Sequence, residues 1–506
     1  MPFQPSPQQS DVFKFVTDGR GSAFVEAVAG AGKTTTIVEA CHLMRGSIAF
    51  AAYNKKIAEE IKARTIAEGM SSVAVGTFHS FGFRAWRKVA GGVKIDDKKP
   101  DLLCDDLCVP EELRSFTKKL LSLGKSSAIG LFGSIDDASL WWKIVDHHDL
   151  TETLEEPKDA RFGVQYAQQA ITASRDMAHE LIDFDDMIYM PVVTGCRVWQ
   201  NDWLLVDEAQ DLNASRRALA RKMLRSSGRA IFVGDRHQAI YGFTGADADS
   251  VDLIIREFRA RQLPLTITYR CPKAVVAAAQ EYVQHIEAHP TAPDGAVRDA
   301  HEDDLLEFGL GKSDAVLCRL TAPLVKQAFK FIKAGIACHV EGRDIGAGLA
   351  ALASRWKVKS IQALRDRLAV YVERETEKLN AKGQETKAEA VRDRVDTLNA
   401  IMDNTKSLDE LNAKIASLFS NDEDGHRNTL TLSTVHKSKG REWDRVFILG
   451  FEEYMPSEFA RQPWQVEQER NLIYVAFTRA KRELFLVEMA AAKKAPETKP
   501  EPAAAA

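Results

Sequence analysis

Two strings in the sequence have residue types suited to phosphate chemistry. The first, AVAGAGKT (residues 27–34), joins an apolar run to a helical pattern. Gly30 and Gly32 let the backbone turn its N–H groups towards phosphate oxygens, and the following helix adds its positive end. Lys33 can reach the β- and γ-phosphates, and Thr34 can ligate Mg²⁺. We therefore expect ATP with Mg²⁺ to be held by Ala29, Gly30, Ala31, Gly32, Lys33, Thr34 and Thr35.

The second string, LLVDEAQD, places an acidic pair directly after an apolar run. Asp207 is expected to be a second Mg²⁺ ligand, since hard cations prefer carboxylate oxygen. Glu208 can polarise the water that attacks the γ-phosphate. Positive charge is also needed around that phosphate, and Arg270 in TYRCP and Arg479 in YVAFTRAKR are the candidates. Together the two strings predict ATP hydrolysis.

The bulk composition limits the class of protein. The chain has 506 residues, of which 45% are hydrophobic and 28% charged, with a formal net charge of −4. These values indicate a globular protein and argue against one that binds nucleic acid through overall positive charge. Seven scattered cysteines form no zinc-binding pattern. We expect no membrane span and no signal peptide, hence a cytoplasmic protein.

Apolar runs alternate with helical patterns in two stretches of the chain, which favours an α/β fold with parallel sheets flanked by helices. Ligands of such folds bind at the carboxyl ends of the strands, where both strings fall. We expect a first ATP-binding domain over 1–85 and 200–265 with a helical insertion over 86–199, a second α/β domain over 266–344 and 426–488 with a short helical insertion over 345–425, and a disordered tail over 489–506.

A series of further strings, in chain order, resembles the motifs of superfamily 1A DNA helicases of the UvrD/Rep/PcrA type. These strings include PSPQQSDVF, AYNKKIAEEI, GTFHSFGFR, VGDRHQAIYGFTGA, TITYRCP, STVHKSKGREWDRVF and ERNLIYVAFTRAKR, besides the two above. FAAYNKKIAEE and TFHSFGF are similar to small phage-type members and F-box helicases. The resemblance implies two RecA-like domains with ATP in the cleft between them, and 3′→5′ movement along single-stranded DNA. It also implies the cytoplasm of a bacterial or phage-infected cell.

The resemblance also assigns roles to single residues. It implies that Gln9 reads the adenine, that Tyr269 lies against it and that Glu442 lies near the ribose. It makes Gln238 a sensor of the γ-phosphate, and Arg270 and Arg479 arginine fingers of the second domain.

Contacts to the DNA strand are expected from aromatic and polar residues. Bases stack on aromatic rings without sequence preference, and Tyr241 and Phe243 follow directly on the predicted sensor in QAIYGF. The resemblance adds Tyr53, Asn54, Thr77, His79 and His436 as DNA contacts.

The chain departs from the family pattern at several places. Ala27 replaces the first glycine of the phosphate loop, and Thr35 stands where the family usually has an arginine that stacks on adenine. The insertion over 345–425 is much shorter than in full-length relatives. Three functions stay open: a monomeric 3′→5′ helicase acting on single strands and their junctions with duplex, a translocase that strips proteins but unwinds poorly, and a motor or nucleotide-switched subunit of a repair or defence complex, with replication or repair proteins as possible partners.

Overall fold

The computed structural model covers a chain with two α/β halves and describes residues 4–148, 150–154, 157–240, 249–381, 385–403, 405–420 and 429–489. The first half is built on a six-stranded sheet in the order β3-β2-β6-β7-β1-β8. Its strands are β1 (Ala23–Ala27), β2 (Ile48–Ala52), β3 (Ala74–Thr77), β6 (Asn201–Val206), β7 (Leu224–Gly234) and β8 (Arg261–Leu265). Every neighbouring pair is parallel.

Helices cover this sheet, which is why the buried stretches of its inner strands are apolar. All five residues of β2 are buried, for example. The helices of this half are α1 (Pro7–Asp18), α2 (Lys33–Cys41), α3 (Lys55–Ala67), α10 (Ala214–Lys222) and α11 (Ser250–Phe258). Because the strands are parallel, the turns after β1, β2, β3, β6 and β7 all lie at one edge of the sheet.

The second half holds a seven-stranded sheet in the order β11-β17-β16-β12-β15-β13-β14. Its strands are β11 (Ala296–His301), β12 (Asp314–Cys318), β13 (Cys338–Glu341), β14 (Phe419–Ser420), β15 (Leu430–Thr434), β16 (Trp443–Leu449) and β17 (Ala480–Glu488), and its helices are α12 (Lys273–Ala279), α13 (Thr321–Lys333), α18 (Phe451–Tyr454) and α19 (Pro463–Phe477). All its strand pairs are parallel. The expected α/β fold class, with two parallel sheets flanked by helices, is confirmed.

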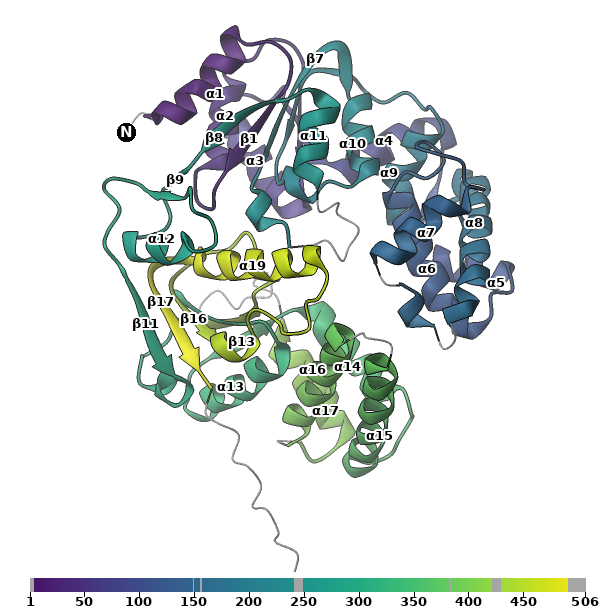
Figure 1. The fold of residues 1–506 in the computed structure, drawn as a ribbon, viewed down its shortest axis with the longest axis vertical. Helices are drawn as coiled ribbons and strands as arrows, with labels where there is room; N and C mark the ends of the chain where they lie inside the picture. Colours follow the sequence, from purple (N-terminus) through teal and green to yellow (C-terminus); the bar gives the residue numbers. More distant parts are fainter. Residues whose placement is uncertain are drawn as a thin grey trace, which may run out of the picture.

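Mainly helical segments follow a strand of each sheet (Figure 1). The first comprises α4 (Phe78–Ala90), α5 (Lys99–Asp106), α6 (Glu111–Ser126), α7 (Ala138–His147), α8 (Ala160–Asp176) and α9 (Phe184–Val193) and has a core of its own around Trp86 and Trp141. The second comprises α14 (Arg343–Ser354), α15 (Ile361–Asn380), α16 (Glu385–Met402) and α17 (Leu408–Leu418). It shares a core with the second sheet, to which β14 also belongs. The domain limits expected from the sequence stay a prediction.

Two short parallel pairs complete the strands of the described residues. They are β4 (Lys94–Ile95) with β5 (Leu181–Ile182), and β9 (Ile267–Thr268) with β10 (Glu287–Ala288). The expected disordered tail lies outside the described residues except for Met489.

The two halves meet along the edge that carries the functional strings. Helix α19 runs along the boundary between the halves (Figure 1). One buried apolar cluster extends from Val25 and Leu265 of the first sheet to Cys271, Val283 and Tyr474 of the second half. Residues 266–286 and α19 therefore lie next to the loop that joins β1 to α2.

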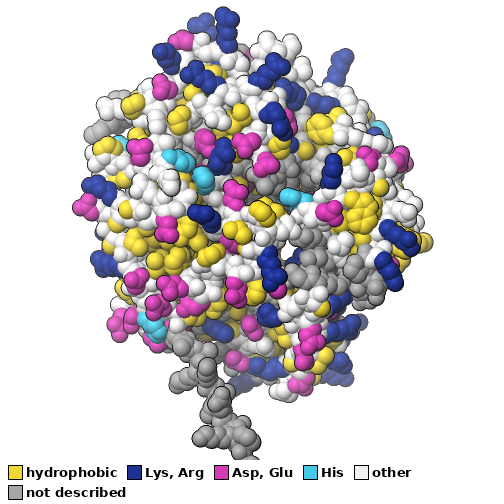
Figure 2. Space-filling model, in the orientation of Figure 1, with side chains coloured by type: hydrophobic (Ala, Val, Ile, Leu, Met, Phe, Trp, Pro, Cys, Tyr) yellow, Lys and Arg dark blue, Asp and Glu magenta, His cyan; other side chains and the backbone are white. Residues whose placement is uncertain are grey.

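The charged side chains on the face shown in Figure 2 are mixed, with Lys and Arg scattered among Asp and Glu. This distribution fits the small negative net charge and shows no broad basic area on that face. Among the described helices, none has both the length and the apolar character needed to cross a bilayer.

Candidate functional site

The loop between β1 and α2 has the backbone shape of an anion cradle. Gly30 and Gly32 have φ values of +72° and +76°, in the left-handed region that favours glycine. A Cβ atom on Gly30 would meet Arg270 Cβ and Thr268 Oγ1 at 2.5 Å, so only glycine fits against the second half there. Helix α2 begins at Lys33, and its positive N-terminal end adds to the pull on an anion.

Two pairs of side chains meet below this loop. The Lys33 Nζ atom lies 3.4 Å from Glu208 Oε1, and Thr34 Oγ1 donates to Asp207 Oδ2 at 3.4 Å. Lys33 Nζ is buried and makes no hydrogen bond to any described residue. A buried ammonium without such a partner has bonding capacity left for a phosphate oxygen.

The electrostatics of the site follow from burial and from its crowded charges. Burial opposes the charge of Lys33, but Glu208, Asp235 and Asp207 outweigh it, so its pKa is raised. Burial likewise opposes the charge of Glu208, but Lys33 and Lys439 lower its pKa to about 2. For Asp207, burial and the neighbouring Glu208 raise the pKa to about 6. An added cation beside Asp207 would reverse this effect and favour its charged form.

Glu208 also has an unusual backbone. Its φ of +49° lies in the left-handed region, which a glutamate seldom adopts. Its Oε2 atom accepts a hydrogen bond of 2.5 Å from Gln210 Nε2, which fixes the carboxylate towards Lys33. Strained residues of this kind are concentrated at functional sites.

Thr34 and Asp207 offer a hydroxyl and a carboxylate oxygen, the donor types that Mg²⁺ prefers. The described residues contain no group of three or more His, Cys, Asp or Glu side chains placed to hold a metal. The two oxygens therefore fit Mg²⁺ that is shared with nucleotide phosphates and water rather than held by protein alone.

The second half brings Arg270 to the phosphate loop. The Tyr269 amide donates to Gly30 O at 2.9 Å, and the Arg270 Cβ atom packs against Gly30. Arg270 Nε donates to Glu442 Oε2 at 2.5 Å. Glu442, the predicted ribose contact, therefore lies beside Arg270, a predicted arginine finger.

Arg479, the other predicted finger, is fully buried in the second half. Its Nε donates to Val475 O at 2.8 Å and one terminal nitrogen to Arg441 O at 3.1 Å. Burial and the nearby Arg270 lower the pKa of Arg479 to about 10. Its guanidinium is thus bonded to carbonyl groups of its own half.

The predicted adenine contacts lie near the loop. Gln9 Nε2 donates to Thr36 Oγ1 at 2.9 Å and lies next to Gly32. Tyr269 is 46% exposed, and its ring centre lies 4.9 Å from that of His289. Thr35 Oγ1 accepts from an Arg64 terminal nitrogen at 3.1 Å. The Arg64 guanidinium of α3 therefore lies beside Thr35, the position at which the family usually has an arginine.

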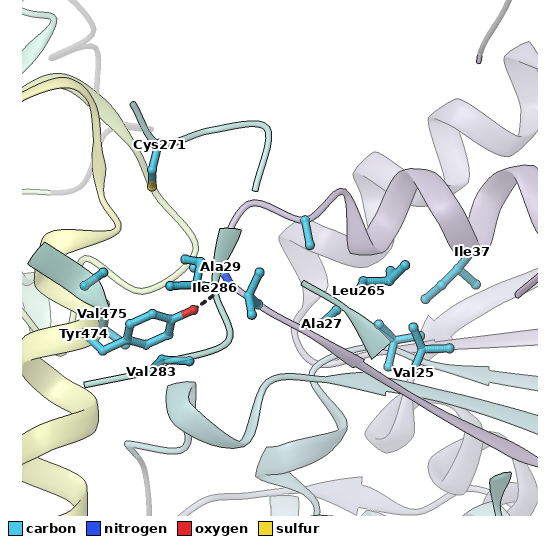
Figure 3. Packing of buried hydrophobic residues seen from close by; sticks show 14 of the residues in the cluster. Val25, Ala27, Ala29, Ile37, Leu265, Cys271, Val283, Ile286, Tyr474 and Val475 are labelled. Carbon is cyan, nitrogen blue, oxygen red and sulfur yellow. Dashed lines mark hydrogen bonds between the residues drawn. The ribbon is translucent and has the colours of Figure 1, made fainter. Parts of the chain in front are cut away.

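A network of polar contacts behind the loop joins the halves. Tyr474 of α19 accepts a hydrogen bond from the Ala29 amide at 2.9 Å (Figure 3). The same hydroxyl donates to Asp235 Oδ2 at 3.3 Å. The same Asp235 atom accepts from Gln238 Nε2 at 2.7 Å. Two side chains, Asp235 and Tyr474, therefore connect the predicted sensor to the loop between β1 and α2.

Lys439 makes a second bridge. Its Nζ atom contacts Asp211 Oδ2 at 2.6 Å and donates to Gln238 O at 2.7 Å, although Lys439 belongs to the second half. Neither Lys439 nor Tyr474 was predicted as a site residue. Both lie in strings that carry the resemblance, but a string alone does not tell which side chain crosses between the halves.

Two of the predicted DNA contacts line one cavity, of about 180 Å³, together with residues of α6, α9 and α10. Tyr53 and His79 lie there with Arg216, whose guanidinium is 5.6 Å from the centre of the Tyr53 ring. Burial and Arg216 lower the pKa of His79 to about 4. Lys125 and Ser122 are also in the wall, so the cavity combines an aromatic ring with cations and hydroxyl groups.

The remaining predicted DNA contacts are placed differently. The Asn54 and Thr77 side chains cap α3 and α4, by accepting from Ile57 N and Ser80 N. His436 follows β15 in the second half, where burial and then Arg319 lower its pKa to about 4. Tyr241 and Phe243 lie outside the described residues.

Comparisons with known proteins match both halves of the chain. The UvrD/REP helicase N-terminal domain matches residues 7–259, and the UvrD-like helicase C-terminal domain matches residues 349–490. The ATP-dependent DNA helicase Rep of Salmonella typhimurium is 29% identical over 301 residues, which are 54% of this chain and 42% of Rep. The match thus spans less than half of that relative's length.

Two other relatives are matched over most of the chain. The ATP-dependent DNA helicase PcrA of Bacillus subtilis is 23% identical over 622 residues, or 95% of this chain and 82% of PcrA. The ATP-dependent DNA helicase UvrD2 of Mycobacterium tuberculosis is 25% identical over 547 residues, or 92% of this chain and 76% of UvrD2.

Proposed function

The chain belongs to the UvrD/Rep helicase family, and we propose that it is an ATP-driven motor that moves 3′→5′ along single-stranded DNA and opens duplex at junctions. The observation that carries the proposal is the close packing of Gly30 against Arg270. A nucleotide bound at the phosphate loop would lie between the two halves, so its hydrolysis can change how they fit together.

In this proposal, Lys33 binds the β- and γ-phosphates through the nitrogen that has no hydrogen bond among the described residues. Thr34 and Asp207 hold Mg²⁺, which neutralises phosphate charge when bound. Arg270 and Arg479 contribute the remaining positive charge, after Arg479 exchanges its carbonyl partners for the γ-phosphate.

Glu208 activates the attacking water only when nucleotide is present. Beside Lys33 and Lys439 the pKa of Glu208 is lowered to about 2, so its carboxylate is a poor base there. Phosphate oxygens that draw Lys33 away would remove the first of these cations. The basicity of Glu208 would then rise, so that water is activated beside bound ATP.

The link from hydrolysis to movement runs through the shared contacts. Gln238 senses the γ-phosphate, and Asp235, Tyr474 and Lys439 tie that sensor to the second half. Each cycle of closing and opening changes the distance between strand contacts on the two halves. Tyr53 and His79 supply such contacts on the first half and His436 on the second, and Tyr241 and Phe243 supply a stacking platform that follows the sensor.

A second candidate function is a translocase that removes proteins from single strands and unwinds poorly. It is favoured by the way the short helical segment over 345–425 is attached. Asp393 of α16 accepts hydrogen bonds from Thr321 N and Ala322 N, and Glu389 pairs with Arg319 at 2.8 Å. These contacts hold α16 against the second sheet, which leaves the segment little freedom to engage duplex.

One set of DNA substrates distinguishes the helicase from the translocase and tests the direction of movement. Duplexes with a 3′ or a 5′ single-stranded tail would be offered with ATP, and release of the displaced strand would be measured. Unwinding with the 3′ tail supports the helicase, and a preference for the 5′ tail contradicts the direction. Removal of streptavidin from a biotinylated single strand without unwinding selects the translocase. Lys33→Ala serves as the inactive control.

A further inference from the structure

A cavity of about 430 Å³ opens at the edge of the first sheet that faces away from the nucleotide site. Its wall includes the first residues of three strands: Ile48 of β2, Ala74 of β3 and Asn201 of β6. Helix α4 closes one side with Phe81, Arg84, Ala85 and Lys88. Their spacing of three and four residues places these four side chains on one face of the helix.

The charged groups of this cavity are all positive. Among the described residues, Arg84, Lys88 and Arg197 belong to its wall, and no Asp or Glu does. All three side chains are exposed, and none forms an ion pair with a described residue. The described wall therefore has three cations and no acid to balance them.

The floor is apolar, and an aromatic side chain stands at the rim. Ile48, Phe81 and Ala85 are buried there. Trp199, by contrast, is 70% exposed, and Lys88 Nζ lies over its ring, 5.8 Å from the ring centre. Exposed tryptophans beside apolar pockets are typical anchors of protein interfaces, since each buries a large area at little entropic cost.

The position of the cavity argues against the moving DNA strand as its occupant. The predicted strand contacts Tyr53 and Thr77 come at the carboxyl ends of β2 and β3. The cavity lies at the amino ends of the same strands. Because β2 has five residues, its two ends are about 16 Å apart. An apolar floor also suits an inserted side chain better than a sugar–phosphate backbone.

We propose that this cavity docks an acidic peptide segment of another protein. The segment would carry carboxylates for Arg84, Lys88 and Arg197, next to an apolar or aromatic side chain that enters the floor beside Trp199. Charge complementarity selects the partner, and burial of the apolar side chain supplies the affinity. Such a site would recruit the motor without blocking either the nucleotide or the strand.

The proposal is tested by fluorescence anisotropy on the full chain without nucleotide. The probe is a fluorescein-labelled peptide of six aspartates followed by one phenylalanine. Peptides with asparagine for aspartate, or alanine for phenylalanine, serve as probe controls. The protein variants are the double charge reversal Lys88→Glu with Arg197→Glu, and Trp199→Ala. The double reversal Lys312→Glu with Lys333→Glu, and Phe132→Ala, are matched changes of two exposed cations and of a 58% exposed aromatic residue elsewhere. Thermal unfolding followed by circular dichroism checks that each variant folds.

We expect the acidic probe to bind in the micromolar range, and both cavity variants to weaken it at least about tenfold, which is the effect of losing one interface hot spot. The two matched variants and the parent chain should bind alike, and both control peptides should bind poorly. Absence of binding, or equal binding by the cavity variants, overturns the proposal. It is also overturned if a thymidine oligonucleotide or a DNA duplex, rather than the peptide, loses affinity in the charge-reversed variant.

Discussion

The Tyr474 hydroxyl accepts a hydrogen bond of 2.9 Å from the Ala29 amide and so fixes α19 of the second half to the phosphate loop of the first. The same hydroxyl donates to Asp235, and the ring belongs to the apolar cluster that both halves share. One side chain thus joins the loop, the end of β7 that precedes the predicted sensor Gln238, and the helix between the halves.

Tyr474→Phe keeps the ring and removes only these two hydrogen bonds. Because the Ala29 amide and the Asp235 carboxylate are buried, we expect the free energy of unfolding to fall by about 1–3 kcal/mol. Turnover of ATP should fall severalfold as well, since the loop loses its contact with α19. Urea denaturation and steady-state ATPase measure the two effects. Tyr282→Phe is the control, because the Tyr282 ring packs on Phe477, which belongs to α19 like Tyr474. An equal loss of stability and turnover in both variants would contradict the role of Tyr474.

Lys439→Met should destabilise the chain strongly. The ammonium of Lys439 and the carboxylate of Asp211 are both buried, with exposures of 7% and 1%. Removing one partner of a buried pair leaves an uncompensated charge, and such changes cost about 3–5 kcal/mol. The measurement is again chemical denaturation.

Lys437→Met is its matched control from the same turn. The Lys437 pair with Asp344 is exposed, 41% on one side and 67% on the other, so its loss should cost less than about 1 kcal/mol. If the two lysine variants were equally stable, Lys439 would not be a structural bridge between the halves.

The sequence predicts those features of the fold and site that depend on local pattern. Apolar runs followed by Gly30, Gly32 and Lys33 require a strand, a turn and a helix start, and the structure has all three. The acidic pair after β6 meets Lys33 and Thr34 because parallel strands end at one edge of the sheet.

Contacts between distant segments are less visible in the sequence. Nothing local indicates that Arg64 of α3 reaches Thr35, or that Arg479 is bonded to carbonyl groups of its own half. The cavity beside Trp199 likewise combines residues from four separate segments, and the one motif string among them, GTFHSFGFR, gives no sign of a cavity. Such features depend on the packing of whole elements, which periodicity does not specify.

His79 should make the stability of the chain depend on acid pH. Burial and Arg216 hold its pKa near 4, against about 6.5 in an unfolded chain, so the unfolded state binds more protons between these values. Stability is therefore lost as the pH falls from about 6.5 towards 4, and at pH 5 this group accounts for about 1–2 kcal/mol. Between pH 7 and pH 5 the free energy of unfolding should therefore fall less in His79→Gln than in the parent chain. His301→Gln, at a side chain that is 40% exposed, serves as control. An unchanged pH slope in His79→Gln would contradict the prediction.

Arg216→Met should weaken binding to single-stranded DNA. Arg216 is the cation nearest Tyr53 in the cavity between α6, α9 and α10. If it contacts one phosphate, the slope of log Kd against log salt concentration should decrease by about 0.7. Titration of a labelled thymidine oligonucleotide at several salt concentrations measures this slope. Arg221→Met changes an exposed arginine of the same helix and should leave the slope as it is; a similar change in both variants would remove Arg216 from the strand path.

The central claim is that ATP hydrolysis at Lys33 and Glu208 is coupled to a DNA strand. The most direct measurement is ATP turnover by the full chain with increasing single-stranded DNA, next to Glu208→Gln with its ATP binding followed separately. The account predicts a severalfold rise in turnover that saturates with DNA, and a variant that still binds ATP but hydrolyses it about 100-fold or more slowly. Turnover that does not respond to single-stranded DNA, or that survives in Glu208→Gln, would contradict it.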